Sequence, residues 1–235
     1  MIKRNLSLDL IRTLAIVLMV IFHFIYDLKY FGWVTWNTPD GNGWKHFRFV
    51  ILSLFFICIG ASLVYSHFHK FQLKKYNVRL LKVLIGAILI TLMSLVMFPH
   101  NWIYFGVLHF IVVASLIAII FIPHPHIALI TGVVLIIGEQ FGLLSKHWPF
   151  YYFNDLLPSY TTDYVPLFPW LGVILLGISL AHSQWFNTTF FTKTKFTNTK
   201  LLKKLTFVGK HSLLIYLLHQ PLLFAILTPI HWWLN

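Results

Sequence analysis

The sequence has a single cysteine, Cys58, which lies within an apolar run. One cysteine cannot build a disulfide framework within the chain or supply the cysteine pairs of a zinc site. Acidic residues are also rare, with 6 Asp and Glu against 18 Lys and Arg, for a formal net charge of +12. Only 10% of the residues are charged and 58% are hydrophobic. A soluble domain carries about 25% charged residues, so this composition predicts a polytopic membrane protein.

Long apolar stretches recur along the whole chain. A transmembrane helix needs about 20 predominantly apolar residues. Seven stretches qualify, at about 8–28, 48–67, 80–98, 104–122, 126–144, 166–184 and 211–233. We therefore expect an all-α bundle of about seven transmembrane helices, forming a single domain over residues 1–235. Pro221 and Pro229 lie inside the last stretch and predict a kink or a break there.

The basic residues lie mostly in short segments beside these stretches. If the N-terminus is cytoplasmic, most Lys and Arg residues fall on the cytoplasmic side, and the other side holds Lys29, Lys45, Arg48 and Lys146. Cytoplasmic loops of membrane proteins carry such an excess, so the N-terminus is predicted inside and the C-terminus outside. The basic charge then serves topology and contact with anionic lipids, and it does not indicate nucleic-acid binding.

Three segments between the stretches differ in character. Residues 29–47 and 145–165 are rich in Trp and Tyr and lie on the predicted outer side. Such residues form the aromatic belt at a membrane interface, and they also stack on sugars, so both interpretations stay open. Residues 185–210, rich in Lys, Thr and Asn, are interpreted as a solvated inner linker.

Four polar side chains share one side of the first stretch: Asp9, Arg12, His23 and Asp27. A helix turns by about 100° per residue, which places Arg12 near 300°, His23 near 320° and Asp27 near 0° relative to Asp9. All four fall within roughly a 60° sector of an otherwise apolar helix. Ionisable residues inside a membrane helix cost free energy. These four residues, called the polar ladder below, are therefore a candidate functional site.

The spacing of the four residues suggests different roles for the two ends of the polar ladder. Asp27 follows His23 by one turn, where a carboxylate can hold a neutral imidazole in the orientation of a general base. Arg12 lies roughly 16 Å further toward the cytoplasmic end. Alternatively, Arg12 extends to lipid headgroups and His23 only packs. The ladder is also compatible with a proton-coupled transporter or channel, or with a scaffold that packs against partner helices.

Other polar residues extend the candidate site. Arg79 and Lys82 project together at the cytoplasmic start of the third stretch, where two cations suit a phosphate-bearing ligand. Arg48, near the outer end of the second stretch, either anchors at the interface or pairs with Asp27. His109, Glu139 and His219 lie inside later stretches. The histidines show no ligand spacing, so no metal site is expected.

Several motifs resemble one known family. The opening helix reads D-x-x-R-x10-H-x3-D from Asp9 to Asp27. Later segments are FGVLH at 105–109, DYVPLFPWLG at 163–172 and GKHSLLIYLLHQP at 209–221. Together they resemble bacterial membrane proteins of the heparan-alpha-glucosaminide N-acetyltransferase catalytic-domain-like family, within the transmembrane acyltransferase superfamily. The resemblance runs over nearly the whole chain.

The resemblance implies acyl transfer across a bacterial cytoplasmic membrane. The donor would be cytosolic acetyl-CoA, and the acceptor a hydroxyl or amine of an extracytoplasmic glycan or lipid-linked sugar. His23 would be the catalytic base, with Asp27 and Arg12 in support. Arg12, Arg79 and Lys82 would bind the donor, although Lys82 stands where some members have Arg. The residues expected to contact the acceptor are Arg48, His109, Asp163, Trp170 and His219. Membrane lipids are further expected partners, and homo-oligomerisation stays open.

Overall fold

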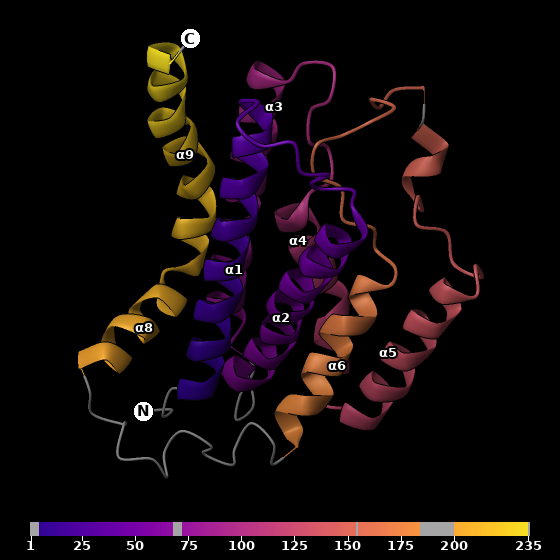
Figure 1. Ribbon diagram of the computed structural model, residues 1–235. Coiled ribbons are helices and arrows are strands. Elements are labelled where there is room, and N and C mark those ends of the chain that lie inside the picture. The colour runs from indigo at the N-terminus through magenta and orange to yellow at the C-terminus, as the bar shows by residue number, and fades with distance from the viewer. Residues whose placement is uncertain (1–4, 68–71, 154, 184–199, 235) are drawn as a thin grey trace. The chain divides into compact units, whose positions relative to one another are not determined.

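The chain is helical throughout the residues that the computed structural model describes, which are 5–67, 72–153, 155–183 and 200–234, and these residues contain no strand. Four of the helices are long and apolar enough to cross a membrane (Figure 1). They are α1 (Leu6–Tyr30), α2 (Asn42–His67), α3 (Leu73–Met97) and α9 (Ser212–Leu234). The predicted all-helical membrane class is therefore confirmed.

Three apolar helices are shorter than the stretches that predicted them. They are α4 (Val107–Ala118), continued by the 3-10 turn η1 (Ile119–Phe121), α5 (Pro125–Gln140) and α6 (Trp170–His182). A helix of 16 residues is about 24 Å long, less than the ~30 Å hydrocarbon core of a bilayer. Glycine sets two of the ends: Gly106 caps α4 in an extended conformation, and Gly142 follows α5 with φ of 71°. The count of seven membrane spans stays a prediction.

The chain divides into two compact units. The first comprises Met1–Phe55 and Thr188–Asn235, and thus holds α1, the beginning of α2, α8 (Lys200–Lys210) and α9. The second, Phe56–Asn187, holds the rest of α2 with α3 to α6 and the short 3-10 helix η2 (Phe150–Phe153). The single domain expected over residues 1–235 stays a prediction.

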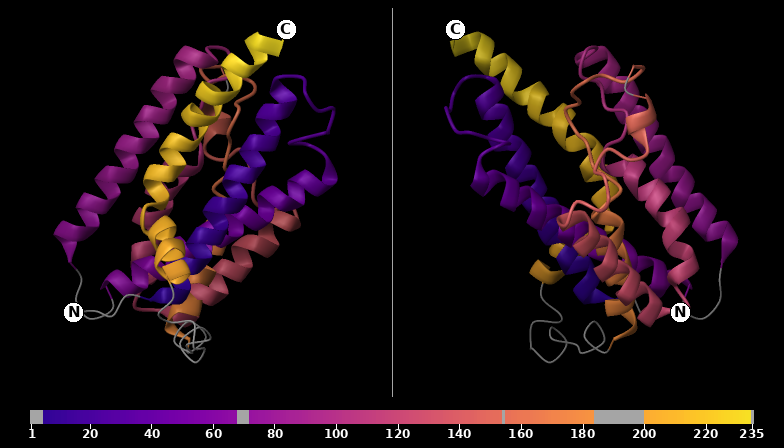
Figure 2. Two further views of the ribbon diagram at one scale, coloured as in Figure 1. Left: turned by 60° about the vertical axis from the view of Figure 1, so that its left-hand side comes forward. Right: turned by 90° about the vertical axis from the view of Figure 1, so that its right-hand side faces the viewer.

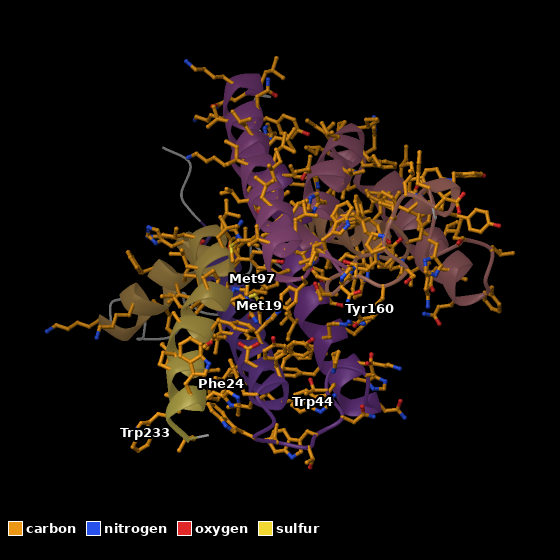
Figure 3. All side chains as sticks on the ribbon, turned by 90° about the horizontal axis from the view of Figure 1, so that it is seen from above. Met19, Phe24, Trp44, Met97, Tyr160 and Trp233 are labelled. Atoms are coloured by element: carbon orange, nitrogen blue, oxygen red, sulfur yellow. The ribbon has the colours of Figure 1, made fainter. Side chains whose placement is uncertain are left out.

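The first unit is built around an apolar cluster on α1. Ile16, Met19 and Phe22 are buried there together with Ile51 of α2. Val208 of α8 and Ile215 and Tyr216 of α9 pack against them, as does Trp44 of α2. Figure 3 labels Met19 and Trp44 within this packing. The cluster occupies the middle of α1, so the polar residues of α1 are left at its two ends.

Helix α8 was not expected, because residues 185–210 were interpreted as a solvated linker. Residues 200–210 form a helix that lies against the N-terminal part of α1 (Figure 1). The Thr13 hydroxyl donates a hydrogen bond to the carbonyl oxygen of Leu205 at 2.5 Å, and Gly209 lies directly against the backbone of Asp9. Leu205, Thr206 and Gly209 share one helical face, and this periodicity overrides the polar composition of the segment. Residues 184–199 lie outside the described part.

Helix α9 runs unbroken from Ser212 to Leu234 through both of its prolines, as the two views of Figure 2 show. Of the kink or break expected at Pro221 and Pro229, the break is therefore not found, and the kink stays a prediction. Each proline lacks an N–H group, so Pro221 leaves the carbonyl of Leu217 without its usual helical donor. Membrane helices tolerate this loss where neighbouring groups or local adjustments compensate.

Glycines allow the helices of the second unit to approach closely. A Cβ atom on Gly132 of α5 would lie 2.9 Å from the Gly172 carbonyl oxygen of α6, and the reverse distance would be 2.6 Å. Gly60 of α2 and Gly177 of α6 likewise lie against the backbone of the other helix. Small residues at such crossings are typical of helix packing in membranes. The short helices α5 and α6 are thus held by backbone contact.

Replacing Gly60 with alanine should destabilise the second unit. The new Cβ would lie 2.9 Å from the backbone nitrogen of Ile178 and closer still to the carbonyl of Ile174. Overpacking of this kind costs about 1–3 kcal/mol, so we expect a lower melting temperature of the detergent-solubilised protein. The matched control is Gly43→Ala in the same helix, where the Cβ meets nothing within 4 Å. Equal stability of the two variants would contradict the packing described here.

Candidate functional site

The C-terminal part of α1 faces α9 through two pairs of polar side chains. The rings of His23 and His219 lie edge to face, with centroids 4.7 Å apart and an interplanar angle of 77°. One turn further along α1, Asp27 Oδ1 accepts a hydrogen bond of 2.7 Å from Gln220 Nε2. His219 and Gln220 are adjacent in α9, so the two pairs lie side by side. All four residues belong to the first unit.

Backbone hydrogen bonds select the tautomer of each neutral histidine. His23 Nδ1 lies 2.9 Å from the Met19 carbonyl oxygen, and His219 Nδ1 lies 2.6 Å from that of Tyr216. A carbonyl oxygen only accepts, so Nδ1 of each ring donates the proton. The lone pair of each neutral ring is then on Nε2. Both imidazoles are consequently oriented as proton acceptors, which is the state that a general base requires.

The site contains three buried polar atoms without a hydrogen-bond partner in the described structure: Asp27 Oδ2, His219 Nε2 and Gln220 Oε1. The Asp27 side chain belongs to a residue that is 0% exposed. A buried polar group left unsatisfied costs about 1–3 kcal/mol. All three atoms are acceptors, given the tautomer above. The arrangement therefore suits a ligand group with several hydrogen-bond donors, such as an ammonium group or a pair of hydroxyls.

The predicted polar ladder is divided into two parts. At its N-terminal end, Arg12 Nη1 lies 3.4 Å from Asp9 Oδ1, and Asp9 is buried. Between Arg12 and His23, the same side of α1 buries Ile16 and Met19 in the apolar cluster. Asp9 and Arg12 border the contact of α1 with α8, and His23 and Asp27 border the contact of α1 with α9. Within the first unit, the ladder therefore lies at contacts between helices.

The predicted residues of the first unit fall into different settings. His23, Asp27 and His219 are brought together, as described above. The hydrogen bond found at the Asp27 carboxylate comes from Gln220, so the orientation of His23 by Asp27 stays a prediction. Arg48 is exposed on α2, whereas Asp27 is fully buried. An interfacial position fits Arg48, and its predicted contact with the acceptor stays a prediction.

Three residues expected to contact the acceptor lie in the second unit in structural contacts. His109 Nε2 lies 3.1 Å from Thr91 Oγ1. Asp163 Oδ2 accepts from the backbone N–H of Val107 at 3.3 Å, in the first turn of α4, where a carboxylate is favoured by the helix dipole. Trp170 is buried, with its ring 5.4 Å from that of Phe56. Their role in binding the acceptor stays a prediction.

The loop that carries Asp163, within residues 145–165, is held by aromatic contacts. The Tyr164 hydroxyl donates to the Lys146 carbonyl oxygen at 2.7 Å, and its ring lies 5.9 Å from that of Tyr104. Burial raises the pKa of Tyr164 to about 12, with Tyr104 adding to the shift. By contrast, Tyr151 and Tyr152 of the same loop are 65% and 75% exposed. These exposed rings fit both the aromatic belt and the sugar-stacking interpretation.

The predicted donor-binding pair lies on α3. Arg79 is half-buried and Lys82 is exposed, three residues apart on the same helix as the sequence predicts. Their binding of acetyl-CoA stays a prediction. Among the described residues, no group of three His, Cys, Asp or Glu side chains is gathered in a way that could hold a metal ion.

Gln220 was not predicted from the sequence. Its signal was present, because an amide inside an apolar helix beside His219 needs a partner as much as a charged group does. Its contact with Asp27 joins residues 193 positions apart, which no local pattern reveals. Glu139, noted only as an intramembrane acid, pairs with Lys146 Nζ at 2.9 Å in the second unit.

The comparison with protein families decides the classification. The family model described as "Heparan-alpha-glucosaminide N-acetyltransferase, catalytic" matches residues 4–221. The chain belongs to this family. The matched region includes α1 and the start of α9 up to Pro221, and so contains all four residues of the His23–His219 and Asp27–Gln220 pairs. A search of curated proteins and a search of solved structures each found no match.

Membership of the heparan-alpha-glucosaminide N-acetyltransferase family confirms the resemblance seen in the sequence motifs. It indicates acetyltransferase activity in a membrane protein, with acetyl-CoA as the general donor of the family and a glycan as acceptor. The four long apolar helices agree with the membrane setting.

Replacing Gln220 with leucine should loosen the contact between α1 and α9. The substitution leaves the fully buried Asp27 without its hydrogen bond, at a cost of about 1–3 kcal/mol. We expect a lower melting temperature in detergent. The double variant Asp27→Leu/Gln220→Leu should recover most of the loss, because removing both partners leaves no unsatisfied group. Leu222→Ala, at a position that is 56% exposed on the same helix, is the control. A double variant as unstable as the sum of the two single variants would argue against the pair.

Proposed function

We propose that the chain is an integral-membrane acyltransferase that moves an acetyl group from cytosolic acetyl-CoA to an amine or hydroxyl of an extracytoplasmic glycan or lipid-linked sugar. His23 is the general base. The observation that carries the proposal is the cluster of the buried Asp27 with the half-buried His23, His219 and Gln220 within the matched region. The family name favours an amine as the accepting group.

The acceptor group binds where the structure leaves acceptor atoms unsatisfied. Asp27 Oδ2, His219 Nε2 and Gln220 Oε1 are buried at the contact of α1 and α9. An amine or hydroxyl of the acceptor satisfies them with its N–H or O–H donors. Asp27 adds a negative charge in an apolar setting, which favours an ammonium over a neutral group.

His23 then removes a proton as the acceptor attacks. Its Nδ1 donates to the Met19 carbonyl oxygen, so Nε2 accepts the proton from the attacking nitrogen or oxygen. The new bond forms to the acetyl carbonyl carbon, the carbon–sulfur bond breaks, and the thiol of CoA leaves. General-base assistance of this kind contributes about 10²–10⁴-fold to the rate, and positioning contributes further.

The donor binds from the side of the N-terminus, which the positive-inside rule assigns to the cytoplasm. Arg12 is partly exposed beside Asp9, and Arg79 and Lys82 carry charge on α3. Cations of this kind suit the phosphates of CoA. Ile16 and Met19, buried between Arg12 and His23, offer no polar side chain for a proton relay along α1. This favours the acyltransferase over a proton-coupled transporter.

His23→Ala should abolish acetyl transfer, with a fall of about 10²–10⁴-fold in rate, while the protein still inserts in the membrane. The assay uses proteoliposomes loaded with labelled acetyl-CoA, glucosamine outside, and mass detection of the acetylated product. His126→Ala, which alters an exposed histidine of α5, is the control. Normal transfer by His23→Ala would rule out His23 as the base. Proton flux without acyl-CoA in the wild type would instead support the transporter.

Arg79→Gln and Lys82→Gln should weaken donor binding. Loss of a charge-assisted contact to phosphate is worth about 1.5–3 kcal/mol, or about tenfold or more in KM for acetyl-CoA. The kcat should change little, since Arg79 and Lys82 take no part in the proposed chemical step. Lys75→Gln, at an exposed position of the same helix, serves as the reference. An unchanged KM in both variants would remove Arg79 and Lys82 from the donor site.

A further inference from the structure

His219 is paired with His23, and the function proposed above gives it a place in acceptor binding but no proton-transfer step of its own. Its ring lies edge to face with that of His23, with centroids 4.7 Å apart. Its Nδ1 donates to Tyr216 O at 2.6 Å, and its Nε2 is buried without a hydrogen-bond partner. A second imidazole with a buried, unsatisfied lone pair is costly to keep as packing alone.

The chemistry of an amine acceptor calls for two bases. A primary amine is an ammonium ion at neutral pH, and the nitrogen lone pair is then occupied by a proton. One proton must leave before the nitrogen can attack, and a second must leave as the amide forms. A hydroxyl acceptor loses only one proton. A site with two imidazoles, each presenting Nε2 as an acceptor, therefore matches an ammonium better than a hydroxyl.

We propose that His219 is a second catalytic base, which removes the first proton from a bound ammonium group before His23 removes the second. This inference rests on the proposed function. In the first step, His219 Nε2 takes one proton from the ammonium and leaves a neutral amine. In the second step, the amine attacks the acetyl thioester, His23 Nε2 takes the second proton, and the carbon–sulfur bond breaks. The CoA thiolate leaves with a proton returned from the site, so that one proton is released overall.

The surroundings of His219 support this order. Asp27 lies one turn from His23 and is tied to Gln220, the neighbour of His219, so its carboxylate is close to the pair as counter-charge for an ammonium. The titratable groups recorded around His219 are His23 and Asp27 on α1 and Tyr216 on α9 itself. From α8, Lys200, Lys204 and Lys210 are exposed. The groups that can assist His219 are therefore the carboxylate of Asp27 and the imidazole of His23.

The test compares the pH dependence of acetyl transfer in variants of the full-length protein in proteoliposomes, with glucosamine as the acceptor. His219→Asn is the first choice, because its amide N–H can still donate to the Tyr216 carbonyl. His219→Ala is the second. At neutral pH we expect a fall of about 10²-fold in kcat. The loss should shrink by about tenfold per pH unit as the external pH rises, because solvent then deprotonates the ammonium. The loss in His23→Ala should not shrink in this way.

A second acceptor makes the test independent of pH. Hydroxylamine is uncharged at neutral pH and has no first proton to lose. At saturating hydroxylamine, the kcat of His219→Asn should stay within about threefold of the wild-type value, and its KM should rise because the variant lacks the acceptor-binding Nε2, whereas the kcat of His23→Ala should stay impaired. A structural role for His219 predicts the same loss for both acceptors and at every pH, and that result would overturn the proposal, as would an unchanged rate with glucosamine.

The outcomes also separate this inference from the proposed function. If the wild-type protein acetylates neither glucosamine nor hydroxylamine, the acyltransferase proposal fails. If the wild type acetylates both and the His219 variants lose activity equally with both, only the second base is disproved. Melting temperatures of the variants in detergent show whether His219→Asn or His219→Ala unfolds the protein. If one of them does, the ratio of the transfer rates with glucosamine and with hydroxylamine is measured on the other variant and decides the test.

Discussion

The candidate site depends on a hydrogen bond between a buried carboxylate and the amide of a half-buried glutamine. Asp27 is 0% exposed and receives Gln220 Nε2 at 2.7 Å. In an apolar helix contact, a carboxylate without a partner would be expelled or neutralised. The bond therefore couples the register of α9 to that of α1, and this register places His219 edge to face with His23. Asp27 Oδ2, His219 Nε2 and Gln220 Oε1 remain buried without a hydrogen-bond partner, and in the proposed function the ligand supplies the donors for these atoms.

The apolar cluster of the first unit gives this site its position along α1. Ile16, Met19 and Phe22 pack against α2, α8 and α9 in the middle of the helix. Polar groups are thereby confined to two ends: Asp9 and Arg12 beside α8, and His23 and Asp27 beside α9. In the second unit, glycines such as Gly60 and Gly177 bring helix backbones into contact, as Gly209 of α8 does against Asp9 in the first unit. Side-chain interdigitation and backbone approach are two ways of packing apolar helices.

Much of the site could be predicted from the sequence, and the limits have clear physical causes. His23 and Asp27 were found because ionisable residues stand out in an apolar helix and because helical spacing places them on one side. His219 was found through its motif and its depth. Gln220 was missed, since a neutral amide gives a weaker signal than a charge. Helix α8 was missed because its lysines dominated the composition while its apolar face, which packs on α1, is narrow. The late beginning of α4 and the early end of α5 were missed because hydropathy does not register Gly106 and Gly142, which set these two helix ends.

The sequence by itself determined the membrane class, the helical architecture, the polar residues of α1 and the family. These follow from composition, from periodicity within single helices and from short motifs, all of which are local properties of the chain. Only the tertiary structure decided which groups meet: Asp27 with Gln220, His23 with His219, and Thr13 with Leu205. It also selected the histidine tautomers through the carbonyls of Met19 and Tyr216. The physical reason is that contacts between residues up to 193 positions apart depend on how helices pack against each other, and a pattern within one helix carries no record of its neighbour.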